Sequence, residues 1–234
     1  MKFNYRIIED FKDYTSLESD ILYLTSSKTV ADYLKKNNEA VCINLPDEED
    51  ISEFNEYKYI TINGEEDVEH LKKIYCHIKG IPYVIVSNDS ITIREEAPED
   101  LKKIYAMYSD EECAKYLSPL PPFYTFDAER RFASVKNGYM LFGYGMWIIE
   151  KTDTKEVIGR VGFEYSDSSS VSLGFMIKES ERKKGYANAA AHLCVNYLRK
   201  NLPDLKIVAN CSRENIASIR ILESLDIDYI TIEA

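Results

Sequence analysis

The chain has 234 residues, of which 45% are hydrophobic and 29% are charged, a composition typical of folded globular proteins. Its length fits one large domain or two smaller ones and is sufficient for a sizeable hydrophobic core. The net charge of -11 disfavours a nucleic-acid partner, because binding to phosphate needs a basic surface.

Two further features bear on where the protein works. No apolar run approaches the roughly 18 residues of a membrane-spanning helix, and Glu9 and Asp10 interrupt any apolar signal segment near residue 1. We therefore expect no membrane partner and a cytoplasmic location. The five cysteines are scattered and form no C-x-x-C pair, so we expect reduced thiols, no disulfide framework and no metal site.

The first 89 residues alternate between strand-like and helix-like segments. Apolar runs predict strands, and apolar residues spaced three and four apart predict helices. The predicted strands span residues 21–25, 41–45, 59–62 and 82–87, and the predicted helices span 27–36 and 65–78, the second ending at a Gly80 cap. The alternation predicts a small open α/β domain over residues 1–89. It contains no catalytic motif, and its role stays open.

From residue 90 the pattern changes to closely spaced strands and further helices. Strands are predicted over 91–94, 142–150, 157–165, 171–177, 206–210 and 228–232, helices over 98–108, 126–135, 186–200 and 215–224, and an irregular loop over 118–124. The links between residues 142 and 177 are short, so the three strands there are predicted to be antiparallel neighbours.

The most informative segment follows the strand predicted over 171–177. It reads Arg182-Lys183-Lys184-Gly185-Tyr186-Ala187 and leads into a helix. The first N–H groups of a helix have no partner within it, so they can bind a pyrophosphate at the positive end of the helix dipole. Glycine lets the backbone approach closely, and the basic residues add charge-assisted bonds. The alternative interpretation is a solvated basic turn before an amphipathic helix.

A second segment, Asn215-Ile216-Ala217-Ser218, opens another helix after another predicted strand. The amide of Asn215 and the hydroxyl of Ser218 are placed to reach the same ligand. The alternative is that Asn215 serves as the N-cap of the helix. Both interpretations can hold together.

Residues 91–234 resemble the GNAT superfamily of acetyl-CoA-dependent N-acetyltransferases. The resemblance rests on the order and spacing of five segments, 91–94, 157–162, 173–177, 182–187 and 215–225. Within the superfamily, residues 215–220 are similar to the branch that includes ribosomal-protein N-terminal acetyltransferases. The resemblance implies an α/β fold over residues 90–234. Its mixed, mostly antiparallel sheet would be splayed between the fourth and fifth strands, with helices on both faces.

The resemblance also implies acetyl-CoA as cosubstrate and direct transfer of its acetyl group to a primary amine. The residues implied to bind it are Phe175, Met176 and Ile177 on the fourth strand, through their backbones; Arg182, Lys183, Lys184, Gly185, Tyr186 and Ala187 at the pyrophosphate; and Asn215 with Ser218 on the last helix. The expected acceptor is an amine-bearing small molecule or a protein N-terminus. A homodimer is one assembly to expect.

The catalytic residues are less evident, because the sequence departs from the family pattern. Many members have a tyrosine acid where Leu222 stands, and many have a carboxylate near the position of Ser172. Glu164 is the nearest carboxylate and is a candidate base, or else an exposed glutamate at a strand end. A water chain anchored by Asn210 or Ser172 is the other candidate. These departures leave an alternative function, a catalytically idle acyl-CoA-binding regulatory module.

Overall fold

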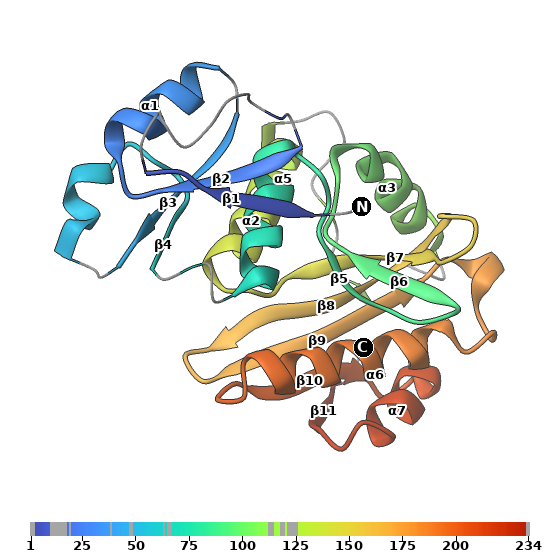
Figure 1. The fold of residues 1–234 in the computed structure, drawn as a ribbon. Helices are drawn as coiled ribbons and strands as arrows, with labels where there is room; N and C mark the ends of the chain where they lie inside the picture. The colour runs from blue at the N-terminus through green and yellow to red at the C-terminus, as the bar shows by residue number, and fades with distance from the viewer. Residues whose placement is uncertain are drawn as a thin grey trace. The chain divides into compact units, whose positions relative to one another are not determined.

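The computed structural model describes residues 3–9, 18, 20–37, 39–46, 49–62, 64, 67–111, 115–117, 120 and 126–232. The chain divides into two compact units, Met1–Tyr83 and Val84–Ala234, and each has its own sheet (Figure 1). Apart from Leu120, the loop expected over residues 118–124 lies outside the described residues.

The first unit contains a four-stranded parallel sheet in the order β1-β2-β3-β4. Its elements are the strands β1 (Asn4–Ile7), β2 (Ile21–Thr25), β3 (Ala40–Leu45) and β4 (Ile60–Ile62), the helices α1 (Lys28–Lys36) and α2 (Val68–Lys79), and a 3-10 helix over Glu49–Phe54. The expected open α/β arrangement is confirmed. The sequence did not predict β1, because its four residues, Asn-Tyr-Arg-Ile, contain no continuous apolar run.

Local signals explain the limits of α2. The Asp67 carboxylate accepts a hydrogen bond from the His70 N–H at 2.9 Å and so caps the first turn. At the other end Gly80 takes a left-handed φ of 68°, and its N–H donates to the His77 carbonyl at 3.3 Å. The predicted Gly80 cap is therefore confirmed, and it depends on a conformation that glycine adopts without strain.

The second unit contains a seven-stranded sheet in the order β11-β10-β9-β8-β7-β6-β5. Its strands are β5 (Val84–Ser87), β6 (Ile91–Arg94), β7 (Met146–Lys151), β8 (Val157–Asp167), β9 (Ser170–Ile177), β10 (Lys206–Ser212) and β11 (Asp228–Ile232). Neighbours from β5 to β9 are antiparallel, whereas β10 is parallel to both β9 and β11. The predicted antiparallel neighbours and the mixed sheet are confirmed.

One predicted strand belongs to a different sheet from the one expected. The strand predicted over 82–87 forms as β5, but it pairs with β6 in the second unit instead of completing the first sheet. The cause is a tight turn at Asn88, whose side-chain oxygen accepts hydrogen bonds from the N–H groups of Ser90 and Ile91 at 2.9 Å each. The turn folds β5 back on β6, so the two units divide after Tyr83.

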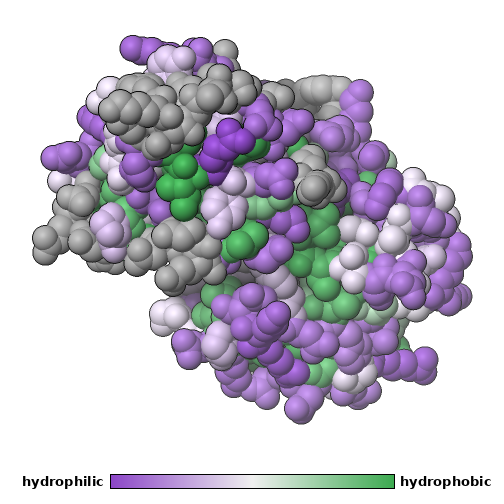
Figure 2. All heavy atoms as spheres, viewed as in Figure 1, coloured by the Kyte–Doolittle hydropathy of each residue, from purple (hydrophilic) through white to green (hydrophobic). Residues whose placement is uncertain are grey.

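Helices cover both faces of the second sheet (Figure 1). On one face lie α6 (Tyr186–Asn201) and α7 (Ile216–Glu223), and on the other lie α3 (Leu101–Tyr108) and α5 (Phe126–Leu141). The α6 face holds the larger core, in which Ala190, Cys194 and Leu198 of the helix pack with Phe163 and Leu173 of the sheet. Among the residues coloured in Figure 2, hydrophilic ones predominate, with hydrophobic ones visible between them.

Candidate functional site

The strands β9 and β10 pair only over their first three residues. Ser170, Val171 and Ser172 face Lys206, Ile207 and Val208 in parallel register. Beyond that point β9 continues to Ile177 along β8, and β10 continues to Ser212 along β11. The two strands therefore diverge inside the sheet, which confirms the splay expected between the fourth and fifth strands. The divergence leaves two strand edges facing an opening.

The pleat of β9 decides which backbone groups face this opening. The Lys178 N–H donates to the Ile158 carbonyl on the β8 side at 2.9 Å. Alternate residues of a strand direct their backbone groups to opposite sides. Phe175 and Ile177 therefore direct theirs toward the opening, whereas Met176 directs its own toward β8. In this conformation the Ile177 carbonyl accepts a hydrogen bond from Arg182 Nε at 3.2 Å.

The loop after β9 turns sharply before α6. Gly185 is the N-cap residue of α6, with a left-handed φ of 85° and no side-chain hydrogen bond to the first turn. Lys183 also takes a positive φ, 61°. Gly185 has no side chain that could cap the amides of Tyr186 and Ala187 in the first turn of α6, so these amides are suited to an anionic ligand.

Carboxylates hold two of the three basic residues of this loop. Lys184 Nζ lies 3.1 Å from the carboxylate of Glu181, and Glu181 also accepts from Lys151 Nζ at 3.1 Å. The Lys151 ammonium holds the pKa of Glu181 below its usual value. Arg182 Nη2 lies 3.9 Å from the Asp110 carboxylate.

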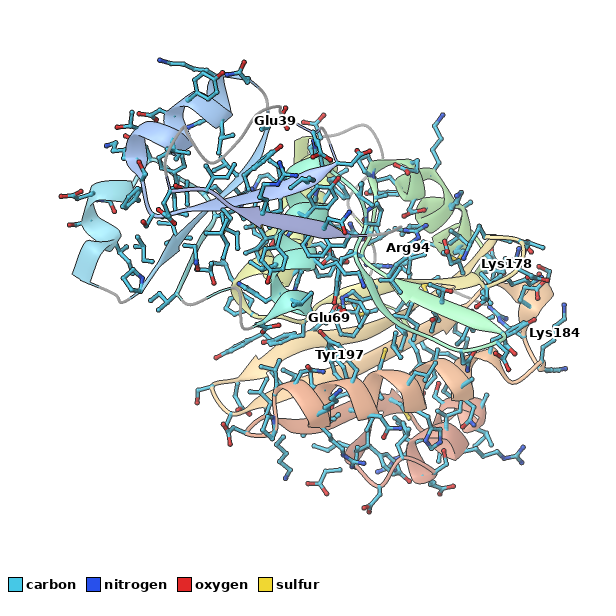
Figure 3. The ribbon with its side chains drawn as sticks, in the orientation of Figure 1. Glu39, Glu69, Arg94, Lys178, Lys184 and Tyr197 are labelled. Atoms are coloured by element: carbon cyan, nitrogen blue, oxygen red, sulfur yellow. The ribbon has the colours of Figure 1, made fainter. Side chains whose placement is uncertain are left out.

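The row of charges continues beyond Lys151 to Glu156 and Lys178. Glu156 accepts from Lys151 at 2.9 Å and from Lys178, and the Lys178 ammonium, followed by Lys151, lowers the pKa of Glu156 to about 2. Figure 3 shows Lys178 and Lys184 at the same end of the second unit. The sequence predicted the basic loop but not the carboxylates that position it. The i, i+3 spacing of Glu181 and Lys184 was the local sequence signal for one of these ion pairs.

On the other side of the opening, Asn215 is the N-cap of α7. Its side-chain oxygen accepts from the Ser218 N–H at 3.2 Å. The capping interpretation of Asn215 is therefore confirmed, and a contact of Asn215 or Ser218 with a ligand stays a prediction.

The three candidate catalytic residues lie on one face of the sheet, around the point of divergence. Glu164 and Ser172 are direct cross-strand partners, and Ser172 pairs with Val208. Asn210 follows Val208 by two residues, so its side chain leaves β10 on the same face. Glu164 and Asn210 are exposed, and Ser172 is half-buried. Leu222 is 2% exposed in the core, so this position offers no group to the opening.

The same face carries a buried charge cluster that the sequence did not reveal. Arg94 donates to both carboxylate oxygens of Asp100, at 2.6 and 3.0 Å, and through Nε to Glu150 at 2.8 Å. Figure 3 shows Arg94 between α3 and the sheet. Burial alone would raise the pKa of Asp100, but hydrogen bonds from Arg94 and from the Ala97 N–H lower it below its usual value.

A second part of the cluster centres on Glu96, whose side chain is fully buried. It accepts from Arg131 of α5 at 3.1 and 3.3 Å and from Arg160 of β8 at 3.2 Å. Burial raises the pKa of Glu96, and the two arginines offset this only in part. The cluster holds α5 and the segment after β6 against β8.

The described residues also bear on two other kinds of site. Nowhere in these ranges do three or more His, Cys, Asp or Glu side chains come together in a way that could hold a metal ion. No helix within them has the length and apolar character needed to cross a membrane.

Comparison with known proteins assigns the second unit to a family. Residues 90–227 match the acetyltransferase (GNAT) domain. The chain is 33% identical over 85 residues to the uncharacterised N-acetyltransferase YjdG of Bacillus subtilis, a match that covers 36% of this chain and 51% of YjdG. The chain thus spans about half the length of that relative. It is also 27% identical over 141 residues to YnaD of the same organism, covering 60% of this chain and 80% of YnaD.

Solved structures share the fold of the second unit. An acetyltransferase from Agrobacterium tumefaciens superposes with a TM-score of 0.51 at 22% identity, covering 60% of this chain and 81% of its own. The ribosomal alpha-N-protein acetyltransferase RimL, in complex with coenzyme A, superposes with a TM-score of 0.52 at 15% identity, covering 62% of this chain and 83% of its own. Since the family match spans more than half of the chain, and the divergent strands and the loop before α6 lie within it, the chain belongs to the GNAT acetyltransferase family.

Proposed function

We propose that the protein is an N-acetyltransferase that transfers the acetyl group of acetyl-CoA directly to a primary amine. The observation that carries this proposal is the divergence of β9 and β10 beside the loop that opens α6. Beyond Ser172, the edge of β9 that β10 no longer covers lies next to the first amides of α6. The edge is suited to an extended amide-containing chain and the amides to a pyrophosphate.

The residues present fit coenzyme A on both counts. The backbone groups of Phe175 and Ile177 face the opening, as pairing with a pantetheine arm requires. The loop residues Arg182, Lys183, Lys184 and Gly185, with the amides of Tyr186 and Ala187, would hold the pyrophosphate. Asn215 and Ser218 stand at the start of α7, on the β10 side of the opening. Acetyl-CoA, when bound there, supplies a thioester whose carbonyl carbon an amine can attack.

The chain's own residues would manage the proton of that amine. An amine with a pKa near 10 is cationic at pH 7 and must lose a proton before it attacks. Glu164 is the candidate base, because it is exposed and is the cross-strand neighbour of Ser172. Ser172 is the residue at which β9 and β10 diverge. Ser172 and Asn210 share its face and could hold a water in the same role. Because a thiol has a pKa near 8.5, CoA can leave as a thiolate without a strong general acid.

The acceptor is either a small amine or a protein N-terminus. RimL, which shares the fold of the second unit, is a ribosomal alpha-N-protein acetyltransferase and is an example of the second class. We propose the primary amine as the shared chemistry. The cytoplasmic location and the homodimer expected from the sequence stay predictions.

Release of free thiol from acetyl-CoA in the presence of a panel of primary amines tests this proposal. The panel should contain polyamines, aminoglycosides, simple alkyl amines and peptides with free N-termini. Thiol release that depends on one of the amines, with the acetylated product identified by mass spectrometry, is the expected result. Calorimetric binding of CoA without thiol release for any amine would instead support the idle acyl-CoA-binding module. Equal binding of CoA and inorganic phosphate would contradict both.

A further inference from the structure

A row of three residues crosses β7, β8 and β9 next to the point where β9 leaves β10. Met146 pairs with Gly162, and Gly162 pairs with Gly174. Gly174 lies two residues beyond Ser172, the last residue of β9 that pairs with β10. Two of the three positions in this row have no side chain, although the rows on either side carry larger residues.

The two faces of the sheet differ at this level. On the α6 face, Leu173 is 4% exposed and Phe163 is 1% exposed, and both pack in the core with α6. Gly174 belongs to the opposite face, together with Ser172 and Glu164, because side chains alternate along a strand. Gly174 itself is half-buried, so that face is not closed over it. Because α6 and its core cover the other face, the face of Gly174 is the one from which an acceptor would approach the opening.

The fold does not require glycine at position 174. A Cβ there would lie 3.7 Å from Met146 Sδ and 3.8 Å from Met146 Cε, which are ordinary van der Waals distances. At Gly162, by contrast, a Cβ would come within 2.0 Å of the Gly145 carbonyl oxygen, and at Gly159 within 2.2 Å of the Met176 carbonyl oxygen. Close backbone packing explains Gly159 and Gly162. It leaves the glycine at 174 without a structural reason.

We propose that Gly174 is a specificity-determining position, where the missing side chain leaves room for the carbon that bears the acceptor nitrogen. The thioether of Met146 forms the adjoining surface, and a thioether adapts readily to different shapes. This inference rests on the proposed function and names the property of the acceptor that the site selects, which is bulk next to the amine. In the reaction the C–N bond forms, the C–S bond breaks, the amine proton goes to the base, and the thiolate of CoA leaves.

The test compares Gly174→Ala and Gly174→Val with the wild type on two amines of similar basicity, n-butylamine and the α-branched sec-butylamine. Gly138→Ala is the matched control, since a Cβ on that α5 residue would also meet its nearest atom at 3.7 Å, the Tyr144 carbonyl oxygen. For Gly174→Ala we expect kcat/KM for sec-butylamine to fall about tenfold, with a smaller loss for n-butylamine and unchanged CoA affinity. Gly174→Val should extend the loss to both amines.

Two kinetic outcomes would overturn the inference. The first concerns the ratio of kcat/KM for sec-butylamine to kcat/KM for n-butylamine. If this ratio is the same for Gly174→Ala as for the wild type and Gly138→Ala, position 174 does not select the acceptor. The other is a loss of CoA affinity in a folded Gly174→Ala, which would place position 174 on the cosubstrate side. Failure of the proposed function looks different, because the wild type would then bind CoA and release no thiol with any amine.

Chemical labelling gives a readout that needs no turnover. In the CoA-bound protein, the thiol of Gly174→Cys should react rapidly with methyl methanethiosulfonate and slowly with a reagent that carries a bulky group. A folded Gly174→Cys that resists even the small reagent would show that the position is closed to acceptors, and the inference would fall.

Discussion

Gly185 and Gly80 offer a matched pair for testing the pyrophosphate site. Both take a left-handed φ, 85° and 68°, and at neither position would a Cβ meet another atom within 4 Å. Gly185→Glu and Gly80→Glu should therefore lose similar stability, about 1–2 kcal/mol from left-handed strain. We expect only Gly185→Glu to weaken CoA binding, by more than about tenfold, because it puts a negative charge and bulk beside a phosphate site. Calorimetry with CoA and thermal unfolding measure the two effects.

The control separates strain from charge at the site. If folded Gly185→Glu binds CoA as tightly as Gly80→Glu does, the loop before α6 does not hold the pyrophosphate. The main argument for the site would then fail.

Glu164 is the residue on which the proposed proton transfer depends. Glu164→Gln should lower kcat/KM for the amine by roughly 100-fold or more while CoA affinity is unchanged, because a base acts on the amine and does not touch the nucleotide. The loss should be greatest at low pH, where most of the amine is protonated. Ser172→Ala should have a smaller effect. Initial rates measured from about pH 6 to 9 check this expectation.

Small effects of both substitutions would favour proton removal by water. If Glu164→Gln keeps more than about half of the wild-type rate across that range, the assignment of Glu164 as the base is wrong.

At the scale of single residues, the sequence predicted the features that depend on residues close together in the chain. The cap at Gly80 and the loop around Gly185 follow from left-handed positions beside a helix end, which favour glycine. The pairing of Glu96 with Arg160 joins residues 64 positions apart, so no local spacing signals it. Nothing local distinguishes Gly174 within its strand, because its neighbour Met146 lies two strands away in the sheet.

Among the elements, buried charges join β6, β7 and the start of α3. Arg94 lies on β6, Glu150 on β7, and Asp100 directly before α3, with its side chain fully buried. Removing one partner of a buried ion pair leaves the other charge without compensation, which is strongly destabilising. The position of α3 over the sheet therefore depends on a charge at its N-terminal end.

Asp100→Asn tests this dependence. We expect it to lower the free energy of unfolding at pH 7 by about 3–5 kcal/mol, and Glu99→Gln, at the exposed neighbouring position, to change it little. The pKa of Asp100 is lower in the folded protein than in the unfolded chain. Its stabilising contribution is therefore present above the unfolded value, about pH 4, and is lost as the pH falls through the folded value.

The difference between wild type and Asp100→Asn should accordingly shrink on acidification. Urea unfolding at several pH values measures it. A difference that stays constant from neutral pH down to the acid limit would show that the Asp100 charge does not stabilise the fold.

Element types were easier to predict than element partners. Apolar runs identified strands such as β8 and β9, and the short turn between them fixed an antiparallel pair. The apolar run of β5 was also predicted to be a strand, but its assignment to the first sheet was wrong. The pairing of β5 with β6 depends on the turn at Asn88, which the apolar pattern of the strand does not reveal. β7 begins at Met146 instead of residue 142, since Gly143 takes a left-handed φ of 74° before it.

On the scale of the whole molecule, the chain contains two units with separate sheets and separate cores. Buried residues of β2, β3 and α2 form one core, and those of the seven-stranded sheet with α6 form another. All the residues proposed to bind acetyl-CoA lie in the second unit. We therefore expect the CoA site to be a property of Val84–Ala234 alone.

Two fragments that differ by five residues test this expectation. Residues 84–234 keep β5, which pairs with β6 and contributes Ile85 and Val86 to the core. Residues 89–234 lack β5, so the edge of β6 is exposed. The longer fragment should fold and bind CoA with the affinity of the full chain, measured by calorimetry. The shorter one should lose stability or aggregate, because an unpaired strand edge invites association with other chains.

The results of the two fragments separate the role of β5 from the role of the first unit. Equal stability of the two fragments would show that β5 adds nothing to the second sheet. A longer fragment that folds with the circular dichroism expected of its helices and strands, yet fails to bind CoA, would show that residues 1–83 contribute directly to the site. In that case the CoA site would not be a property of the second unit alone, and the expectation drawn from the position of the loop before α6 would fail.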